Sequence, residues 1–283
     1  MIYQYFHISK QAVHQYEQRK FVHTIYQQDL FNEVELQRQL HPRMGAKVLY
    51  SVLKPEGIGR VRFEKLLREK GYNLRRVKSY YRTTDSGWVL YKNLIAGRTL
   101  NAINQVWVSD ITYYMLKDEV CYITTIMDLY SRRILGYSAS LTMLSEECSM
   151  KSLRMALTTR KGLNLMGLIH HSDRGSQYRY KGFTDLIEKF GQISMCKSVY
   201  DNSHMERLNG TVKNDYLIPL GVETFREVKR MLPIVVNRYN NLRPHSSLEQ
   251  KTPLEFEQSI AELPIKNRPV QHIKPEIFTI HRN

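Results

Sequence analysis

The sequence is poor in cysteine, in acidic side chains and in long apolar runs. Its three cysteines, Cys121, Cys148 and Cys196, include no Cys-x-x-Cys pair. Cysteines spaced in this way indicate reduced, structural thiols in a cytosolic protein without a zinc site. No apolar run is long enough to cross a membrane, and the N-terminus lacks the apolar segment of a signal peptide. We therefore expect neither a membrane partner nor secretion.

The shortage of acidic residues leaves the chain strongly basic, with 42 Lys and Arg against 27 Asp and Glu and a net charge of +15. An excess of this size favours a polyanionic partner, and nucleic acid is favoured over a membrane surface. The excess is uneven, because residues 1–100 hold more than twice as many basic as acidic side chains. The first third is therefore a candidate DNA-binding region, and the remainder a candidate catalytic region.

Residues 1–85 are predicted to be a helical, helix-turn-helix-like region. The stretch Phe6–Lys20, with Ser9 as a candidate N-cap, suits either a recognition helix or a plain surface helix. Apolar residues then recur at helical spacing in Gly45–Lys54 and Ile58–Tyr72, with a turn between them. This pair adds two further helices to the region, and the helix-turn-helix hypothesis itself rests on Phe6–Lys20.

Basic residues and two tyrosines follow in Leu74–Thr84. This mixture suits contact with a DNA backbone, for which Arg75, Arg76 and Lys78 are the candidates, or alternatively a solvated helix face. Residues 86–104 show little periodicity and are expected to be a linker.

The pattern changes to strands at residue 105. Short turns separate three stretches rich in β-branched and aromatic residues, Gln105–Leu116, Val120–Tyr130 and Ile134–Ser140, which predicts an antiparallel meander. Helices and two further strands then alternate, so the order is β-β-β-α-β-α-β-α. This order predicts an α/β core over residues 105–262, with a mixed five-stranded sheet flanked by helices, and a tail over 263–283.

Three acidic residues occupy positions where an unpaired charge is costly. Asp110 lies inside the first strand, Asp173 follows the fourth, and Glu206 lies early in the third helix of the core. Since ligands of such sheets bind beyond the carboxyl ends of parallel strands, the three could converge at one edge. Clustered carboxylates repel unless a cation joins them, and Mg²⁺ prefers such oxygen ligands. Two such ions about 4 Å apart could promote displacement at phosphorus.

Other readings of these acids and their neighbours stay open. A lone Asp in a strand is more often a turn or salt-bridge residue, which is our interpretation of Asp128. His170 and His171 have the side chains of metal ligands, but strand alternation directs them to opposite faces. Composition alone therefore does not single out a three-carboxylate site.

Four motifs in order, "WVSDITYY", "HSDRGSQY", "YDNSHMERLNGTVKNDYL" and "YNNLRPHSSLEQKTPLEF", resemble the transposases of the insertion-sequence-three family. The resemblance covers roughly residues 40 to 260 and implies the RNase H-like core of the retroviral-integrase-like superfamily. It implies that Asp110, Asp173 and Glu206 are the catalytic and metal-ligating acids, with two magnesium ions, for which manganese can substitute. The segment between Asp173 and Glu206 is somewhat shorter than is usual in the family.

The resemblance also implies DNA contacts and partners. Asn209 and Lys213 share a helix face with Glu206, and this face is expected to follow the DNA. Arg174 and Arg243 are further candidates, although Arg243 could equally serve core packing and Lys213 could be an ordinary solvated lysine. The implied partners are the terminal inverted repeats, the target DNA, other copies of the chain and a fused upstream-frame helix-turn-helix protein. The implied location is the bacterial cytoplasm, with the nucleoid.

The function that these features predict is a DNA transposase that cleaves transposon ends and joins the freed 3′-hydroxyl strands to DNA by metal-dependent phosphoryl transfer. The resemblance further implies a circular intermediate. Two alternatives are a DNA-binding regulator with an inactive RNase H-like core and a metal-dependent nuclease. Joining of the freed end, as opposed to its release, discriminates the first reading from the nuclease.

Overall fold

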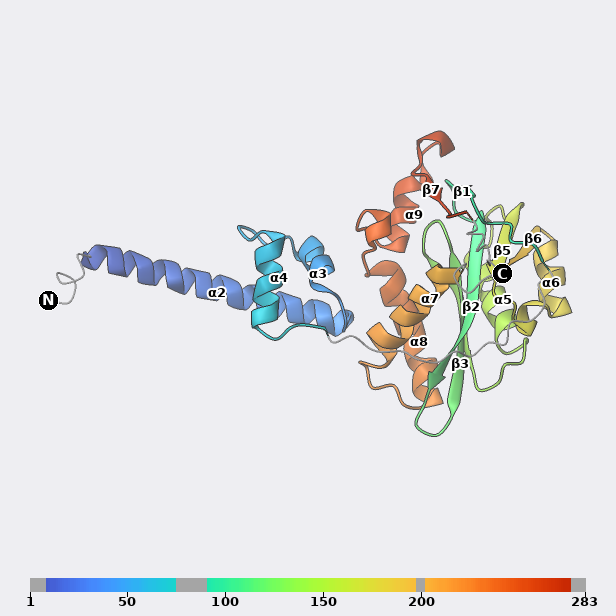
Figure 1. Cartoon of the computed structure of the whole chain (residues 1–283), viewed down its shortest axis with the longest axis horizontal. Helices are drawn as coiled ribbons and strands as arrows, with labels where there is room; N and C mark the ends of the chain where they lie inside the picture. The colour runs from blue at the N-terminus through green and yellow to red at the C-terminus, as the bar shows by residue number, and fades with distance from the viewer. Residues whose placement is uncertain (1–8, 75–90, 197–201, 276–283) are drawn as a thin grey trace, which may run out of the picture. The chain divides into compact units, whose positions relative to one another are not determined.

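A computed structural model describes residues 9–74, 91–196 and 202–275 and divides the chain near Arg75 into two compact units (Figure 1). Each unit has its own hydrophobic core. The predicted DNA contacts Arg75, Arg76 and Lys78 lie outside the described residues. In the part of the chain that is described, no helix is long and apolar enough to cross a membrane.

The N-terminal unit is helical, as predicted. Helix α2 (Lys10–Leu40) begins at Ser9, whose side chain accepts a hydrogen bond from the Ala12 amide at 3.1 Å, which confirms the predicted N-cap. Helices α3 (Ala46–Leu53) and α4 (Arg60–Glu69) follow. Gly57, at a φ of +67°, lies in the turn between them, where a side chain would strain the backbone. The turn predicted between the second and third helical stretches therefore lies between α3 and α4, and α2 runs without interruption.

The second unit is built on a five-stranded sheet of order β4-β3-β2-β5-β6. Strands β2 (Val106–Met115), β3 (Val120–Asp128) and β4 (Ile134–Ser140) form the predicted antiparallel meander. Strands β5 (Leu168–Ser172) and β6 (Gly191–Met195) extend the sheet in parallel from β2. The predicted mixed five-stranded sheet is thus confirmed.

Helices cover both faces of this sheet (Figure 1). Alternation along β2 divides its side chains between two cores, with Val106 and Val108 in one and Trp107 in the other. The Trp107 core holds residues of α5 (Ser149–Thr159) and α6 (Lys181–Glu188). The other core holds residues of α7 (Ser203–Gly210), α8 (Phe225–Asn241) and α9 (Pro253–Ala261). Short helical turns complete the unit, namely η1 (Ser176–Tyr178), η3 (Thr211–Leu217), η4 (Ser246–Leu248) and η5 (Ile265–Asn267).

The predicted linker and tail contribute to the second unit. Strand β1 (Thr99–Leu100), from the expected linker 86–104, pairs antiparallel with β7 (Gln271–His272), from the expected tail 263–283. Ile95 is also buried in the core. The described parts of both segments, 91–104 and 263–275, therefore belong to the folded unit. Two-residue strands are too short to produce the periodicity from which strands are predicted.

The predicted third helix of the core, which carries Glu206, changes its winding at its centre. It is α-helical as far as Gly210 and continues as the π-helical turn η3. Segments of π-helix are rare and occur frequently at functional sites. The change of winding alters which side chains face the sheet after Gly210, and Lys213 lies in the altered part.

Asp128 holds the turn between β3 and β4, as predicted from its position. Its Oδ1 accepts hydrogen bonds from the amides of Tyr130 at 2.9 Å and Ser131 at 3.1 Å, and its Oδ2 accepts one from the Asn104 amide at 2.6 Å. The Asp128 side chain is fully buried, and Arg160 forms an ion pair with it at 3.6 Å. Asp128 is therefore a structural acid.

The same ion-pair network fastens α9 to the sheet through Glu257. The Glu257 carboxylate accepts bonds from Arg160, from Arg133 at 2.7 Å and from the Ser131 hydroxyl at 2.6 Å. Burial raises the pKa of Glu257, but the hydrogen bond and charge of Arg160 outweigh burial and hold it below 4.5. The network therefore stabilises the fold above pH 4.5, and this contribution is lost as the pH falls through the lowered pKa.

We expect Arg133→Met to lower the free energy of unfolding by about 2 kcal/mol, because Glu257 loses a charge-assisted hydrogen bond in a site that is only 9% exposed. Urea unfolding of the purified chain measures this loss. The control is Arg154→Met, since Arg154 pairs with Glu146 while 58% exposed, and such surface pairs contribute about 0–1 kcal/mol. Equal losses in the two variants would contradict a buried role for Arg133.

Candidate active site

Asp110 and Asp173 lie on neighbouring parallel strands. The register of β2 and β5 pairs Val108 with His171, so two residues further along each strand Asp110 stands beside Asp173. Strand β5 ends at Ser172, which places Asp173 directly beyond its carboxyl end. This is the edge at which sheets of this kind bind ligands.

Helix α7 crosses β2 beside Asp110. At its N-cap, Asn202 donates from Nδ2 to the backbone oxygen of Ser109 at 3.3 Å. About two turns later along the helix, Asn209 donates from Nδ2 to Oδ2 of Asp110 at 2.6 Å. The Asn202 side chain does not cap the helix but fastens its first turn to the strand. Glu206 lies between these two attachments and is exposed.

The charges of Asp173 and Glu206 both act on the carboxyl group of Asp110. Burial, then the charge of Asp173 and, to a smaller extent, that of Glu206, raise the pKa of Asp110 to about 8. The hydrogen bond from Asn209 acts in the opposite direction. Burial also raises the pKa of Asp173, although its Oδ1 accepts a bond from the Gly175 amide at 3.0 Å. The fold thus holds these carboxyl groups together although their ionised forms are buried and repel one another. A cation between them would offset this repulsion.

The donor set suits a divalent ion with a preference for oxygen ligands, because carboxylates are the groups brought together. Within residues 9–74, 91–196 and 202–275, no three His, Cys, Asp or Glu side chains are already close enough to hold a metal ion. The two aspartates stand at one level of the sheet, whereas the Glu206 side chain is exposed. Completing a three-carboxylate site therefore requires the three carboxylates to come closer together than they lie here.

We expect Asn209→Ala to raise the pKa of Asp110 above about 8 in metal-free protein, because the Asn209 amide donates to the ionised carboxylate. A carbon-detected NMR titration of the Asp carboxyl groups measures this pKa. Asn237→Ala is the control, since Asn237 is an exposed asparagine on α8. An Asp110 pKa that is the same in Asn209→Ala and in the control would show that Asn209 does not act on Asp110.

Asn209 and Lys213, which were predicted to contact DNA, both point toward β2. Asn209 is 6% exposed and bonded to Asp110. Lys213 donates from Nζ to the Thr112 hydroxyl at 2.7 Å and to the Tyr113 carbonyl at 3.2 Å, and it lies over the Tyr113 ring. Burial lowers the pKa of Lys213, although Asp110 opposes this effect. In the free chain these side chains support the carboxylate strand.

The other predicted DNA contacts are also engaged within the fold. Arg174 donates from Nε to the Cys196 carbonyl at 3.0 Å. Arg243 donates from Nη2 to Oδ2 of Asp215 at 2.8 Å and lies over the Tyr216 ring. Both residues are therefore held in fixed positions in the second unit.

The two histidines of the β5 strand are buried on opposite sides, as alternation predicted. His170 contacts the Ser109 hydroxyl at 3.0 Å and meets the Phe183 ring edge-on, and burial lowers its pKa to about 3. His171 contacts the hydroxyl of Ser194 at 2.8 Å and the sulfur of Cys196 at 3.2 Å. These contacts connect β5 with β2, α6 and β6, so the histidines shape the strand that presents Asp173.

Sequence reasoning missed the buried supports of the site. Tyr178, in η1, packs edge-on against Phe183 and next to His170, and the charges of Asp173 and Asp110 reach its hydroxyl. Its position in "HSDRGSQY" was the available signal, but nothing in the spacing indicates that the ring turns inward. The fastening of α7 by Asn202 likewise depends on a contact between residues far apart in sequence.

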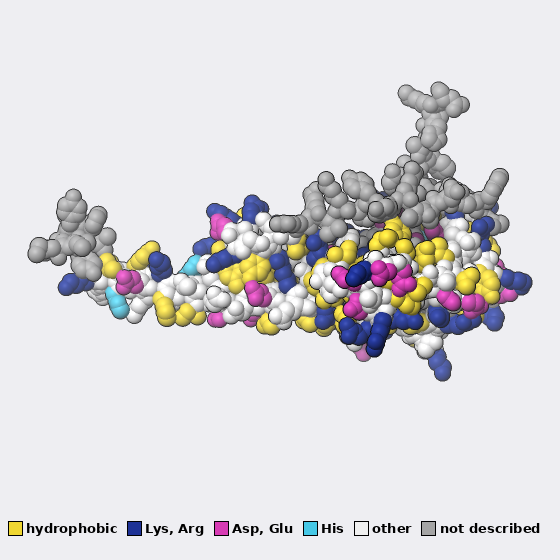
Figure 2. Space-filling view, turned by 90° about the horizontal axis from the view of Figure 1, so that it is seen from below, with side chains coloured by type: hydrophobic (Ala, Val, Ile, Leu, Met, Phe, Trp, Pro, Cys, Tyr) yellow, Lys and Arg dark blue, Asp and Glu magenta, His cyan; other side chains and the backbone are white. Residues whose placement is uncertain are grey.

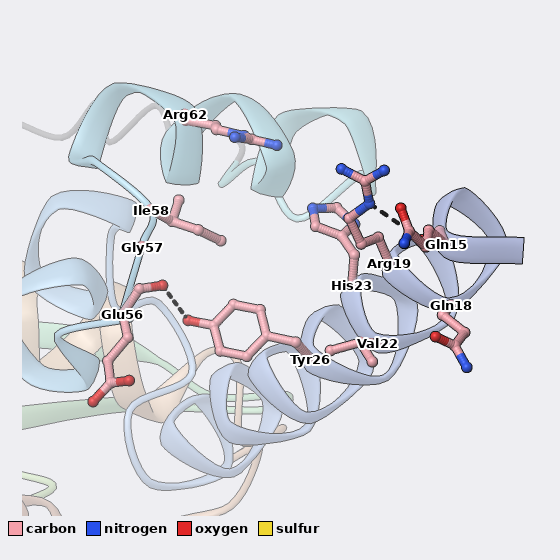
Figure 3. A pocket seen from close by; sticks show the side chains of 10 residues that line it. All are labelled: Gln15, Gln18, Arg19, Val22, His23, Tyr26, Glu56, Gly57, Ile58 and Arg62. Atoms are coloured by element: carbon pink, nitrogen blue, oxygen red, sulfur yellow. Dashed lines mark hydrogen bonds between the residues drawn. The ribbon is translucent and has the colours of Figure 1, made fainter. Parts of the chain in front are cut away.

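A hollow of about 820 Å³ in the N-terminal unit contains none of the three acids (Figure 3). It lies between α2 and the turn that precedes α4, and Tyr26 closes it by donating to the Glu56 carbonyl at 2.8 Å. Arg19, His23 and Arg62 line it together with Val22 and neighbouring side chains. Figure 2 shows Lys and Arg side chains on the described surface of both units. Basic side chains are thus not confined to the N-terminal third.

Comparison with known proteins identifies the second unit. Two family profiles, both described as "Integrase core domain", match residues 101–198 and 193–253. The chain is 32% identical over 234 residues to "Insertion element IS600 uncharacterized 31 kDa protein" of Shigella sonnei, covering 77% of this chain and 83% of the relative. It is also 32% identical over 164 residues to "Transposase for insertion sequence element IS904" of Lactococcus lactis, covering 56% of this chain and 62% of the relative.

Solved structures of similar fold come from viral integrases. The HTLV-2 integrase catalytic core domain, determined in complex with magnesium, is 17% identical, with a TM-score of 0.44 over 58% of this chain and 99% of that domain. A chain of the simian T-cell lymphotropic virus intasome, in complex with PP2A regulatory subunit B56 gamma, is 18% identical, with a TM-score of 0.46 over 83% of this chain and 76% of that one.

Proposed function

The chain belongs to the insertion-sequence-three family of DDE transposases, and from this membership we propose that it cleaves the ends of its element and joins them to DNA. The observation that carries the proposal is the pair Asp110 and Asp173 at the carboxyl end of β5, with α7 and Glu206 beside them. The family relatives do not favour the alternative of a regulator without catalytic activity or of a plain nuclease.

Asp110, Asp173 and Glu206 are the residues that would hold magnesium, or manganese in its place, and two ions are expected. When bound, divalent ions supply charge neutralisation and activation of the attacking oxygen in phosphoryl transfer. The chain's own part is to position the acids. Asn209 orients Asp110, and the Gly175 amide orients Asp173.

Two displacements at phosphorus follow in this proposal. In the first, water attacks a phosphodiester at the transposon end, a phosphorus–oxygen bond to the 3′ oxygen breaks, and a 3′-hydroxyl is released. In the second, this hydroxyl attacks a second phosphodiester, at the other end of the element or in the target DNA, and the displaced oxygen of that strand takes up a proton. Neither step needs a covalent bond between the protein and DNA.

DNA recognition and assembly are assigned by the same proposal. The helical N-terminal unit, followed by Arg75, Arg76 and Lys78, would bind the terminal inverted repeats, and the core would bind the ends and the target. Because two ends must meet, the working form would be a homo-oligomer on DNA. Fusion to an upstream-frame helix-turn-helix protein, and action at the bacterial nucleoid, belong to the same proposal.

A joining assay tests the proposed function directly. Purified chain is incubated with a labelled duplex that carries the terminal sequence of the element, with and without Mg²⁺. A joined product that depends on Mg²⁺ is the expected result. Release of the end without joining would indicate a nuclease, and binding without either reaction would indicate a regulator.

A further inference from the structure

Outside the carboxylate site, three arginines gather where the turn between β3 and β4, helix α7 and the segment after α8 meet. Arg132 lies in the turn, Arg207 on α7, and Arg243 just beyond the end of α8. Arg132 and Arg207 lie within electrostatic range of each other, and all three lie within range of His245. We call Arg132, Arg207, Arg243 and His245 the arginine cluster.

The cluster carries more positive charge than the fold neutralises. Arg243 pairs with Asp215 at 2.8 Å. Asp128 lies in electrostatic range of Arg132, but its own ion-pair partner is Arg160. Within the part of the chain that the structure describes, neither Arg132 nor Arg207 forms an ion pair. Cations held together in this way favour an anionic ligand.

Several hydrogen-bonding atoms of the cluster are buried and unpaired. Nη1 of Arg132, Nη1 of Arg243 and Nε2 of His245 form no hydrogen bond with the described residues. A buried group without a partner costs about 1–3 kcal/mol, and more where it is charged, so such groups are rare in folded proteins. Arg132 is nevertheless held in place, since its Nη2 donates to Gln271 at 3.3 Å. Three such atoms in one cluster suit a ligand with several acceptor oxygens.

The backbone of Arg132 provides an independent indication. Its φ is +62°, in the left-handed region, and its amide donates to the Asp128 carbonyl at 2.8 Å within the turn. This conformation costs a residue with a Cβ roughly 1–2 kcal/mol, and glycine or asparagine is the usual choice. Residues held against such strain concentrate at functional sites. An arginine at this position is explained if its side chain binds a ligand.

A buried tyrosine ring packs against the histidine of the cluster. Tyr239 is 4% exposed, and the His245 ring packs edge-on against it at 4.7 Å between centroids. Burial, together with the charges of the three arginines, lowers the pKa of His245 to about 3. His245 is therefore uncharged at neutral pH and can offer one ring N–H as a donor.

We propose that the arginine cluster is a binding site for a backbone phosphate of DNA. The proposal rests on the proposed function, since it takes DNA as the substrate. Arginine presents a planar pair of donors that matches the oxygens of a phosphate. Because Arg207 directly follows Glu206 on α7, a phosphate bound here fixes the strand relative to the catalytic acids. Such contacts position DNA without reading its sequence.

DNA binding by the full chain tests this site. The affinity for a fluorescent duplex of arbitrary sequence, about 30 base pairs long, is measured by anisotropy in EDTA over a series of KCl concentrations. We expect Arg132→Gly and Arg207→Gln each to weaken binding about tenfold at low salt and to reduce the slope of log affinity against log salt by about one. The control Arg154→Gln, at an exposed arginine of α5, is expected to keep the wild-type slope.

A loss of DNA binding in these variants can be distinguished from unfolding and from failure of the proposed function. Arg132→Gly relieves backbone strain and Arg207 is exposed, so thermal unfolding is expected to show both variants folded. A folded pair of variants with the affinity and salt slope of the wild type would overturn the phosphate site while leaving the proposed function intact. Failure of the wild-type chain to bind any duplex would instead contradict the proposed function.

Discussion

Asp110→Asn, Asp173→Asn and Glu206→Gln are each expected to reduce strand joining by on the order of a thousandfold while leaving DNA binding in place. Each change keeps the size of the side chain and removes the negative charge that a divalent ion requires. The fold brings Asp110 and Asp173 to one level of the sheet and keeps Glu206 on the adjoining helix. Loss of any one of them is therefore expected to remove most of the activity.

The joined product is measured on labelled terminal duplex in Mg²⁺, and anisotropy in EDTA measures binding. Asp185→Asn and Glu188→Gln are the matched controls, because both acids are exposed on α6. They are expected to join at the wild-type rate. A carboxylate variant that joins within tenfold of the wild type would remove that residue from the site.

Asp110→Asn is expected to stabilise the metal-free protein at pH 8 by on the order of 4 kcal/mol. Burial, followed by the charge of Asp173, raises the pKa of Asp110 to about 8 from an ordinary value of 3.8. Between these two pH values the folded chain binds a proton that the unfolded chain does not, so stability falls as the pH rises. The amide removes this dependence, and the difference between variant and wild type is expected to shrink toward pH 4.

Urea unfolding in EDTA at pH 4.5, 6 and 8 measures this difference, and Asp185→Asn serves as the exposed control. Adding Mg²⁺ at pH 8 is expected to stabilise the wild type and not Asp110→Asn, because only the wild type offers the complete carboxylate set. Equal metal-free stability of the two proteins at pH 8 would show that burial and the charge of Asp173 do not raise the pKa of Asp110. Equal stabilisation of both by Mg²⁺ would place the ion elsewhere.

Much of the fold could be predicted because its signals are local. The N-cap at Ser9 depends on a bond to Ala12, three residues away. The meander β2–β4 follows from alternating β-branched and aromatic stretches with short turns. The order of strands and helices then leaves few ways of assembling the sheet. The placement of Asp173 beyond β5 follows from the same reasoning.

The supports of the site could not be predicted, because they depend on contacts across the sheet. In a regular helix Lys213 would share the Glu206 face, but the π-helical turn after Gly210 alters the winding, and Lys213 lies against Thr112. The bond between Asn209 and Asp110 joins residues 99 positions apart. The spacing of residues along one helix gives no information about the strand against which the helix packs.

The two shortest strands, and the choice between two roles for Arg243, also could not be predicted from the sequence. Strands β1 and β7 have two residues each and pair with one another from opposite ends of the core, so neither stretch shows a period. For Arg243 the motif left DNA contact and packing open. The structure adds its bond to Asp215 and the unpaired Nη1, which together give the residue a fixed position and a free donor.

We propose that this chain joins DNA ends through Asp110, Asp173 and Glu206. The most direct measurement places the gene, with its native flanks and any upstream reading frame, on a plasmid in cells, beside the same plasmid carrying Glu206→Gln. Amplification outward from both ends then detects any junction between them. If these three acids carry the joining reaction, we expect a junction in the wild type and none in the variant. A junction of equal abundance in both, or none in either, would contradict it.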